Sequence, residues 1–412
     1  MAESESESER AREIEAAHEP LIIPPQPTGR RIITFQPGVA RTDIVKMVGK
    51  ATAREPVTVN SAGSMFAALQ QVGATDAPLV LERFGLAVVG GGVESANNAA
   101  SMLANLDEVA DSRPEFWLFA LAGPPWSDDA QATWGIHAVD PRGTALSGAG
   151  IKLALLDTGI DLGHPDFIGR PIVARSFVPN ETVNDVQGHG THCAGTAASA
   201  YLGGGNIPRY GVARGVHLHV GKVLNNSGSG RELDIIAGIE WAIAEGCEVI
   251  SMSLGRATHP TEAPDPIYER VGEAALEAGS LVLCASGNES DRRYNYIAPV
   301  GSPANAEAML AVAAIGADAG VATFSCGGVG RGKVDVCAPG VAVFSSRPRP
   351  ELYRKLSGTS MACPHAAGIA ALWAESDASL RGRKLWKALT NAAIPVGGLA
   401  ARDVGAGLVQ AP

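Results

Sequence analysis

Gly358-Thr-Ser-Met-Ala-Cys-Pro-His365 opens a run of small and apolar residues that extends to Trp373. Gly358 permits a tight backbone turn, and a proline at position 364 is tolerated in the first turn of a helix that begins there. Ser360 then lies at the positive end of the helix dipole, where negative charge that develops in acyl transfer is stabilised. The stretch therefore predicts a nucleophilic serine at the start of a buried helix.

A serine hydroxyl needs a base that takes its proton and a third group that orients this base. Residues 151–156 form an apolar, β-branched run that ends in Asp157-Thr-Gly-Ile-Asp161. This pattern predicts Asp157 at the carboxyl end of a parallel strand, an edge that functional carboxylates favour. Gly188-His-Gly-Thr-His192 opens a helical run and places His189 at its N-terminus. Asp157 and His189 are thus the predicted orienting carboxylate and general base.

The stretches Asp157-Thr-Gly, His189-Gly-Thr-His-Cys-Ala-Gly-Thr and Gly358-Thr-Ser-Met-Ala-Cys-Pro-His follow one another in the order Asp, His, Ser. In sequence and order they resemble the three signatures of the subtilisin-like serine proteases, the subtilases or peptidase family S8. The similarity covers about residues 134–409. It implies a serine endopeptidase that works through an acyl-enzyme and needs no cofactor for its chemistry.

The resemblance also assigns residues around the nucleophile. Asn288, in Ala285-Ser-Gly-Asn288 after an apolar strand, matches the oxyanion asparagine of the family and would act with the backbone N–H of Ser360. His192 and His365 belong to the same motifs. They lie one helical turn further in, where a histidine more often bonds to the backbone, so neither is expected to act in catalysis.

Two segments resemble the edges that hold an extended polypeptide substrate by β-augmentation: Lys222-Val-Leu-Asn-Asn-Ser-Gly-Ser-Gly230 and Ser251-Met-Ser-Leu-Gly255. The pocket that the resemblance implies is open and uncharged at its base, which suits large apolar P1 side chains and a broad substrate range. The substrate-binding residues carried over from the family are Leu224, Gly228, Ser229, Gly230, Ser253, Leu254, Gly255, Ala285, Ser286, Gly287 and Gly301.

Residues 130–412 alternate strand and helix patterns, which predicts an α/β domain with a doubly wound, mostly parallel sheet of the subtilisin-like kind. The segment 338–354 is expected to form loops and hairpins. The predicted strands are residues 151–156, 217–223, 249–253, 281–285 and 310–315. The predicted helices follow His189 and Ser360 and cover residues 233–246 and 267–279.

Ahead of this domain, residues 1–29 predict a disordered acidic tail, and residues 30–121 predict a small α+β domain. Its order β-α-β-β-α-β is ferredoxin-like. The elements are strands at 31–36, within 78–89 and at 115–121, and helices at 39–51 and 94–109, with Ala99, Met102, Leu103 and Leu106 on one helix face.

In this position the domain resembles the inhibitor-type prodomain of subtilisin relatives, which assists folding and blocks the active site with its last strand. The chain would then be a zymogen whose own prodomain is its partner, with residues 122–129 as linker and region of self-cleavage. A retained accessory domain is the alternative.

Composition limits the partners and the location. A net charge of -10 argues against nucleic acid or an anionic membrane, and no apolar run has the length of a membrane span. Because Leu21-Ile-Ile23 is stopped by two prolines, no secretory signal is predicted and the provisional location is cytoplasmic. The six cysteines lack metal-like spacing and are expected to be buried thiols, with a Cys326–Cys337 disulfide as the alternative.

Structural calcium is conceivable but unsupported. Asp166 and Asp335 match ligand positions of some family members, whereas the loop at residues 200–210 departs from the family pattern. No metal site is therefore predicted. Two further functions stay open: a dedicated leader-peptide maturation protease or peptide transacylase, and an inactive fold used for binding.

Overall fold

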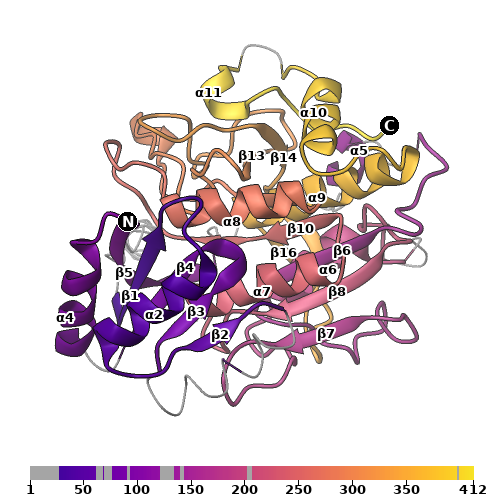
Figure 1. The fold of residues 1–412 in the computed structure, drawn as a ribbon. Helices are drawn as coiled ribbons and strands as arrows, with labels where there is room; N and C mark the ends of the chain where they lie inside the picture. The colour runs from indigo at the N-terminus through magenta and orange to yellow at the C-terminus, as the bar shows by residue number, and fades with distance from the viewer. Residues whose placement is uncertain are drawn as a thin grey trace, which may run out of the picture.

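The computed structural model describes residues 27–61, 68, 77–90, 93–120, 134–139, 143–201, 207–396 and 399–412. The predicted tail up to residue 26, Leu121, the predicted linker 122–129 and residues 130–133 lie outside them. Within the described part, two seven-stranded sheets and a small hairpin organise the chain. The indigo N-terminal part packs against the larger remainder (Figure 1).

The larger sheet has the strand order β14-β13-β12-β10-β6-β8-β7, and all its neighbouring strands run parallel. Its central strands are apolar on both faces, as a sheet covered by helices on both sides requires. The strands are β6 (Lys152–Asp157), β7 (Val173–Ser176), β8 (His217–Lys222), β10 (Val249–Met252), β12 (Leu281–Ala285), β13 (Leu310–Ile315) and β14 (Val336–Pro339).

Helices cover this sheet. The pair α7 (Glu232–Ala244) and α8 (Pro266–Glu277) lies side by side in front of it, and α6 (His189–Ala198) packs on α9 (Thr359–Ser376) (Figure 1). The remaining helices are α5 (Trp134–Val139), α10 (Arg383–Ala392) and α11 (Ala401–Val404). The predicted doubly wound α/β architecture is confirmed.

The two edge strands of this sheet, β7 and β14, were not predicted from the sequence. β7 has four residues, begins at the exposed Val173 and lacks the long apolar run of the inner strands. β14 ends in a proline, which argues against a strand in a sequence pattern. In the segment 338–354 the structure has the end of β14 and the hairpin of β15 (Val343–Ser346) and β16 (Tyr353–Leu356).

The described residues between 27 and 120 are called here the N-terminal unit. In its sheet the order β5-β1-β4-β3 is antiparallel throughout, and β2 adds to β3 in parallel. The strands are β1 (Pro27–Phe35), β2 (Val57–Val59), β3 (Leu79–Leu81), β4 (Leu86–Val89) and β5 (Val109–Ala120). The helices are α2 (Arg41–Thr52), the short η1 (Glu82–Phe84) and α4 (Val93–Ala104).

Several boundaries differ from the predicted ones. β1 begins at Pro27, inside the predicted tail, and β5 begins at Val109 instead of residue 115. α4 ends at Ala104, because the chain turns there into β5, and Met102 is 55% exposed rather than part of the buried helix face. β2 was not predicted, since three residues carry no periodic signal.

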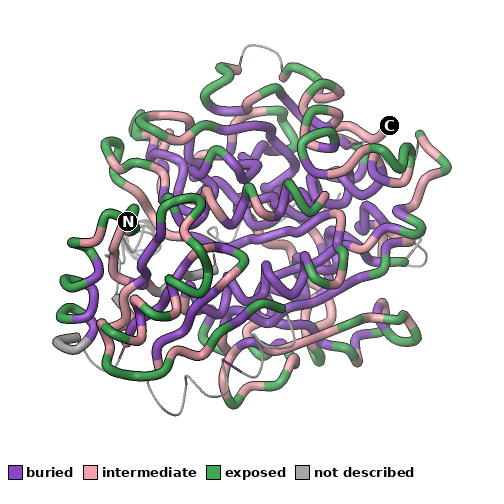
Figure 2. Tube along the Cα trace, viewed as in Figure 1, coloured by how far each residue is buried: buried purple, intermediate pink, exposed green. Residues whose placement is uncertain are grey.

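The sheet of the N-terminal unit has two apolar faces, because side chains alternate along each strand. One face packs on α2 and α4 and contains Ile33, Phe35, Val80, Ala87 and Val89. The other face joins the hydrophobic core of the larger part of the chain and contains Ile32, Leu79, Leu81, Leu86 and Val88. Buried residues accordingly occur in both sheets (Figure 2), and one hydrophobic cluster contains residues of both.

Two further findings concern the cysteines and the helices of the described residues. All six cysteines are buried and free, so Cys326 and Cys337 form no disulfide. Among the helices of this part of the chain, none is long and apolar enough to cross a membrane.

Candidate active site

Asp157 and His189 are in direct contact. Asp157 ends β6, is fully buried, and its Oδ1 lies 2.8 Å from His189 Nδ1. The same oxygen accepts the N–H of Thr158 at 2.7 Å. His189 begins α6 directly after Gly188, whose φ of 93° is the left-handed conformation that glycine tolerates best. The strand end and the helix start thus hold carboxylate and imidazole together.

Close packing of α6 on the loop after β6 maintains this contact. Gly190 donates its N–H to Thr158 Oγ1 at 2.8 Å. A Cβ atom at Gly190 would lie 2.3 Å from the carbonyl oxygen of Gly159. A side chain at this position would therefore push His189 away from Asp157.

The protonation of His189 reflects two opposing effects. Burial alone would lower the pKa of the imidazole, since it disfavours the charged form. Burial is the largest single effect, but the charge and hydrogen bond of Asp157, together with Cys193, outweigh it and raise the pKa of His189 well above its ordinary value. The site is therefore arranged to stabilise an imidazolium beside Asp157.

Ser360 is the second residue of α9, as expected from the sequence. Its hydroxyl lies 3.4 Å from the carbonyl oxygen of Ser253. Its own carbonyl accepts hydrogen bonds from Ser253 Oγ at 2.8 Å and from Cys193 Sγ at 3.4 Å. Cys193 Sγ in turn lies 3.8 Å from His189 Nδ1, so the thiol connects the serine and the histidine.

Sequence reasoning treated Cys193 only as a buried thiol. The signal that could have found its position is the spacing from His189, because residues four apart lie on one helix face.

Asn288 lies beside the nucleophile. Its Oδ1 accepts hydrogen bonds from the N–H and the hydroxyl of Thr359 at 2.9 and 3.0 Å, which identifies its Nδ2 as the other end of the amide. Nδ2 is buried and has no hydrogen-bond acceptor in the described part of the chain. Thr359, which the sequence analysis did not single out, thus fixes the orientation of the Asn288 amide and of its unpaired Nδ2 donor. Buried donors without a partner are rare and call for a functional explanation.

The two other histidines of the motifs bond to backbone. His192 Nε2 contacts the carbonyl oxygens of Val343 at 3.1 Å and Arg354 at 3.0 Å, and burial lowers the pKa of this ring to about 3. His365 Nδ1 contacts the carbonyl oxygen of Met361 at 2.8 Å, and burial lowers its pKa to about 4. Burial thus favours the neutral form of both rings; His192 joins α6 to the hairpin of β15 and β16, whereas His365 bonds within α9.

The two predicted edge segments flank a strand of the chain itself. β5 pairs antiparallel with β9 (Ser229–Arg231) on one side and with β11 (Leu254–Gly255) on the other. Leu118 faces Gly230, Phe119 faces both Ser229 and Gly255, and Ala120 faces Leu254. The N-terminal unit therefore contributes the middle strand of a three-stranded arrangement in which the predicted substrate-binding segments form the edges.

The other predicted substrate-binding residues surround these edges. Gly228 bonds to Asn225 ahead of β9, and the fully buried Leu224 donates its N–H to the carbonyl of Asp157. Ala285 ends β12, Ser286 accepts the N–H of Gly301 at 2.9 Å, and Gly287 donates to Thr359 Oγ1 at 3.2 Å.

The carboxylates considered for calcium already have protein partners. Asp166 accepts hydrogen bonds from the hydroxyl groups of Tyr210 and, at 3.1 Å, of Tyr353. Asp335 contacts Lys333 Nζ and accepts the N–H of Ala311 at 2.9 Å. Hydroxyl and ammonium donors direct hydrogens at the oxygens that a cation would need, so these residues do not fit a calcium site.

Comparisons with known proteins agree with this geometry. The model of the subtilase family (Peptidase_S8) matches residues 148–407. Subtilisin DY of Bacillus licheniformis is 40% identical over 239 residues, which is 58% of this chain and 81% of that protein. Subtilisin Savinase of Lederbergia lenta is 38% identical over 282 residues, covering 68% of this chain and 96% of that protein. M-protease of Shouchella clausii is 38% identical over 295 residues, covering 69% of this chain and 72% of that protein.

Fold and site together define a serine hydrolase built on a doubly wound parallel sheet. The chain belongs to the subtilase family and is a subtilisin-like serine endopeptidase that acts on polypeptides. Its chemistry requires no cofactor.

Proposed function

We propose that the chain is the precursor of an endopeptidase in which Asp157, His189 and Ser360 form the catalytic triad. His189 takes the proton of the Ser360 hydroxyl as this oxygen attacks the peptide carbonyl, and later gives the proton to the leaving amine. Asp157 accepts the hydrogen bond of the other ring nitrogen and stabilises the imidazolium. The 2.8 Å contact and the raised pKa of His189 support these roles.

The oxyanion of the tetrahedral intermediate is stabilised by Asn288 Nδ2 and by the N–H of Ser360 at the start of α9. The support is the unpaired, buried amide donor, held in place by Thr359. A preoriented donor of this kind costs no reorganisation when charge develops.

Substrates bind as an added strand between β9 and β11, with Ser229, Gly230, Leu254 and Gly255 contributing the backbone edges. The pairing of β5 with both segments is the single observation that carries this proposal. Apolar walls at Leu224 and Leu254, together with the backbone of Ala285, Ser286 and Gly287, suit apolar P1 side chains.

Residues 30–121 are proposed to be a ferredoxin-like prodomain that inhibits the enzyme until it is removed. The antiparallel order β5-β1-β4-β3, with one helix after β1 and one after β4, supports this assignment. Ala120 faces Leu254, which directly follows Ser253, and Ser253 contacts Ser360. The strand thus enters the cleft with its C-terminal end toward the nucleophile, and self-cleavage in the region 122–129 or next to it would follow.

The test is the intact mass of the purified full chain and of its Ser360→Ala variant, produced in parallel. Wild type should be cut within residues 118–129, and the variant should remain whole. Peptide hydrolysis should fall by about 10⁶-fold in the variant, the loss known for subtilisin itself. If both proteins stay intact, self-processing is wrong. Labelling of wild type by a fluorophosphonate then decides whether the nucleophile is reactive.

A further inference from the structure

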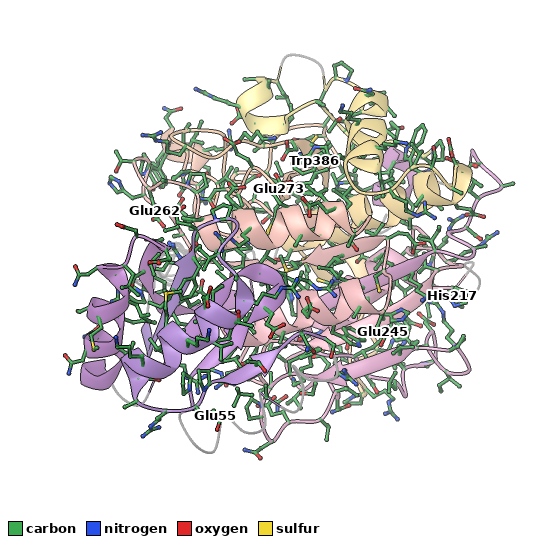
Figure 3. All side chains as sticks on the ribbon, viewed as in Figure 1. Glu55, His217, Glu245, Glu262, Glu273 and Trp386 are labelled. Carbon is green, nitrogen blue, oxygen red and sulfur yellow. The ribbon has the colours of Figure 1, made fainter. Side chains whose placement is uncertain are left out.

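Beyond the end of β9, β5 is held by a cluster of buried charges. Arg113 donates from Nη1 and Nη2 to the two carboxylate oxygens of Glu232, at 2.7 and 3.1 Å. Its Nε lies 2.6 Å from Asp265 Oδ2. Glu232 begins α7 and is fully buried, and Asp265 caps α8 and is 6% exposed. By contrast, acidic side chains such as Glu55 and Glu273 are exposed at the surface (Figure 3).

This cluster lies where β5 passes from the sheet of the N-terminal unit to β9: Arg113 still faces Ile32 of β1, and β9 pairs with the strand from Trp117 onward. Trp117 faces Arg231, the last residue of β9. The next N–H along the strand, that of Phe116, donates to Glu232 Oε2 at 2.7 Å. Where β9 ends and α7 begins, the Glu232 side chain thus takes the place of the next backbone acceptor for β5. A polypeptide that binds along β9 as β5 does would therefore pass Glu232.

The neighbouring charges within the larger part of the chain have partners of their own. Arg231 forms a bidentate pair with Asp234, with contacts of 2.7 and 2.8 Å, and Arg256 lies 2.6 Å from Glu262. Glu232 and Asp265 instead receive their cation from the N-terminal unit. When that unit leaves, two adjacent carboxylates lose their cation, and like charges close together repel each other.

We propose that Glu232 and Asp265 form a guanidinium-binding subsite at the far end of the substrate cleft. It selects polypeptides with an arginine seven residues N-terminal to the residue that faces Leu254, the place that Arg113 occupies in the precursor. The inference rests on the proposed function, in which β5 occupies the cleft as a substrate does. Arginine is favoured over lysine, because only the planar guanidinium serves both Glu232 oxygens and Asp265 at once.

The experiment compares three donor–quencher peptides with the wild-type full chain after self-processing. One has the sequence of residues 111–129, and the others carry Arg113→Lys or Arg113→Gln. The arginine peptide should exceed the glutamine peptide in kcat/KM by about 10-fold or more, since hydrogen bonds between charged groups are stronger than those of a neutral amide. The lysine peptide should lie between them.

Two enzyme variants locate the effect. Glu232→Gln should reduce the arginine-to-glutamine ratio to within about twofold, and Asp265→Asn should reduce it in the same direction if the first variant fails to fold. Glu277→Gln, an exposed carboxylate on α8, is the matched control and should keep the wild-type ratio.

Equal rates for the three peptides with an active wild-type enzyme overturn the subsite and leave the proposed function intact. A preference for arginine that survives both Glu232→Gln and Asp265→Asn overturns it as well. Absence of any hydrolysis by wild type overturns the proposed function and this subsite together.

Discussion

The two sheets of the molecule obtain their hydrophobic cores in different ways. The parallel sheet is covered on both faces by helices of its own part of the chain, and every residue of β10, β12 and β13 is buried. The sheet of the N-terminal unit packs one face on α2 and α4, and its other face shares the core of the larger part. The comparison indicates that the larger part covers its sheet with its own helices. One face of the sheet of the N-terminal unit, in contrast, is buried only by contact with the larger part.

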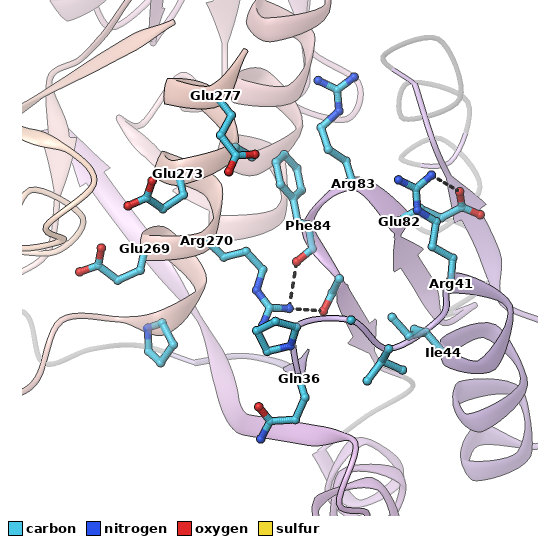
Figure 4. A pocket seen from close by; sticks show the side chains of 16 residues that line it. Gln36, Arg41, Ile44, Glu82, Arg83, Phe84, Glu269, Arg270, Glu273 and Glu277 are labelled. Atoms are coloured by element: carbon cyan, nitrogen blue, oxygen red, sulfur yellow. Dashed lines mark hydrogen bonds and ion pairs between the residues drawn. The ribbon is translucent and has the colours of Figure 1, made fainter. Parts of the chain in front are cut away.

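The polar contacts follow the same division. In the larger part, Asp157 and His189 pair with each other inside that part, whereas charged groups of the N-terminal unit form pairs across the interface. Arg83 lies 3.1 Å from the buried Glu240, and Arg270 on α8 donates to the carbonyl oxygens of Phe84 and Gly85 at 3.1 and 2.8 Å (Figure 4). An open pocket of about 540 Å³ lies between α8 and the N-terminal unit, lined by residues of both.

After the loss of Ser360, the largest effect is expected from Asn288, the proposed oxyanion donor in the larger part. Asn288→Ala should lower kcat by about 10²–10³-fold with little change in KM, which is the loss known for the oxyanion asparagine of subtilisin. The reason is that Nδ2 acts only when the oxyanion forms. Steady-state kinetics on a small chromogenic peptide measure it. An unchanged kcat would exclude Asn288 from the oxyanion site.

The comparison of cores is tested by two isoleucines that are equally buried. Ile33→Ala in β1 and Ile250→Ala in β10 should each cost about 2–5 kcal/mol, because both leave a cavity. Hydrogen exchange measured by mass spectrometry on the Ser360→Ala full chain should show faster exchange confined to the N-terminal unit for Ile33→Ala. For Ile250→Ala it should spread through the parallel sheet.

Ile32, next to Ile33 on the opposite face of β1, sharpens this test. Ile32→Ala should accelerate exchange in the N-terminal unit and also in α7 and α8, since its side chain belongs to the shared core. Equal effects of the Ile32 and Ile33 changes on α7 and α8 would contradict the assignment of the two faces.

The pH dependence of catalysis should follow the raised pKa of His189. Only neutral imidazole can take the proton of Ser360, and Asp157 holds the ring protonated to a pH above its ordinary pKa of 6.5. We therefore expect kcat/KM to rise with pH through an apparent pKa above 6.5 and to be lost in acid. Asp157→Asn should move this limb to lower pH. If kcat/KM of the wild type rises with an apparent pKa at or below 6.5, Asp157 does not control the pKa of His189.

The smallest effect is expected from metal removal. The hydroxyl groups of Tyr210 and Tyr353 donate hydrogen bonds to Asp166, so this carboxylate is not expected to bind calcium. EDTA should therefore shift the thermal midpoint of the Ser360→Ala full chain by less than about 2 °C. Differential scanning calorimetry with and without added calcium measures this shift. A fall of more than about 5 °C that calcium restores would reveal a site beyond Asp166 and Asp335.

The parallel sheet and the order of the three motifs could be predicted from the sequence alone. Long buried strands such as β12 and β13 carry continuous apolar runs, and α6 and α9 begin directly after glycines that precede His189 and Ser360. These are local signals, so the bounds of β12 and β13 agree with prediction, whereas α6 and α9 each end three residues from the expected position. Short edge strands such as β7 and β2 lack them, because a neighbouring strand rather than their own pattern holds them in place.

Which distant residues meet follows from the tertiary structure alone. The contacts of Cys193 with Ser360, of Thr359 with Asn288 and of Arg113 with Glu232 join elements that are far apart in the chain. Neither residue of the last pair stands in a motif, and the two are 119 positions apart. Their meeting depends on the placement of β5 between β9 and β11, since long-range pairing follows from packing and strand register and leaves no local trace in the sequence.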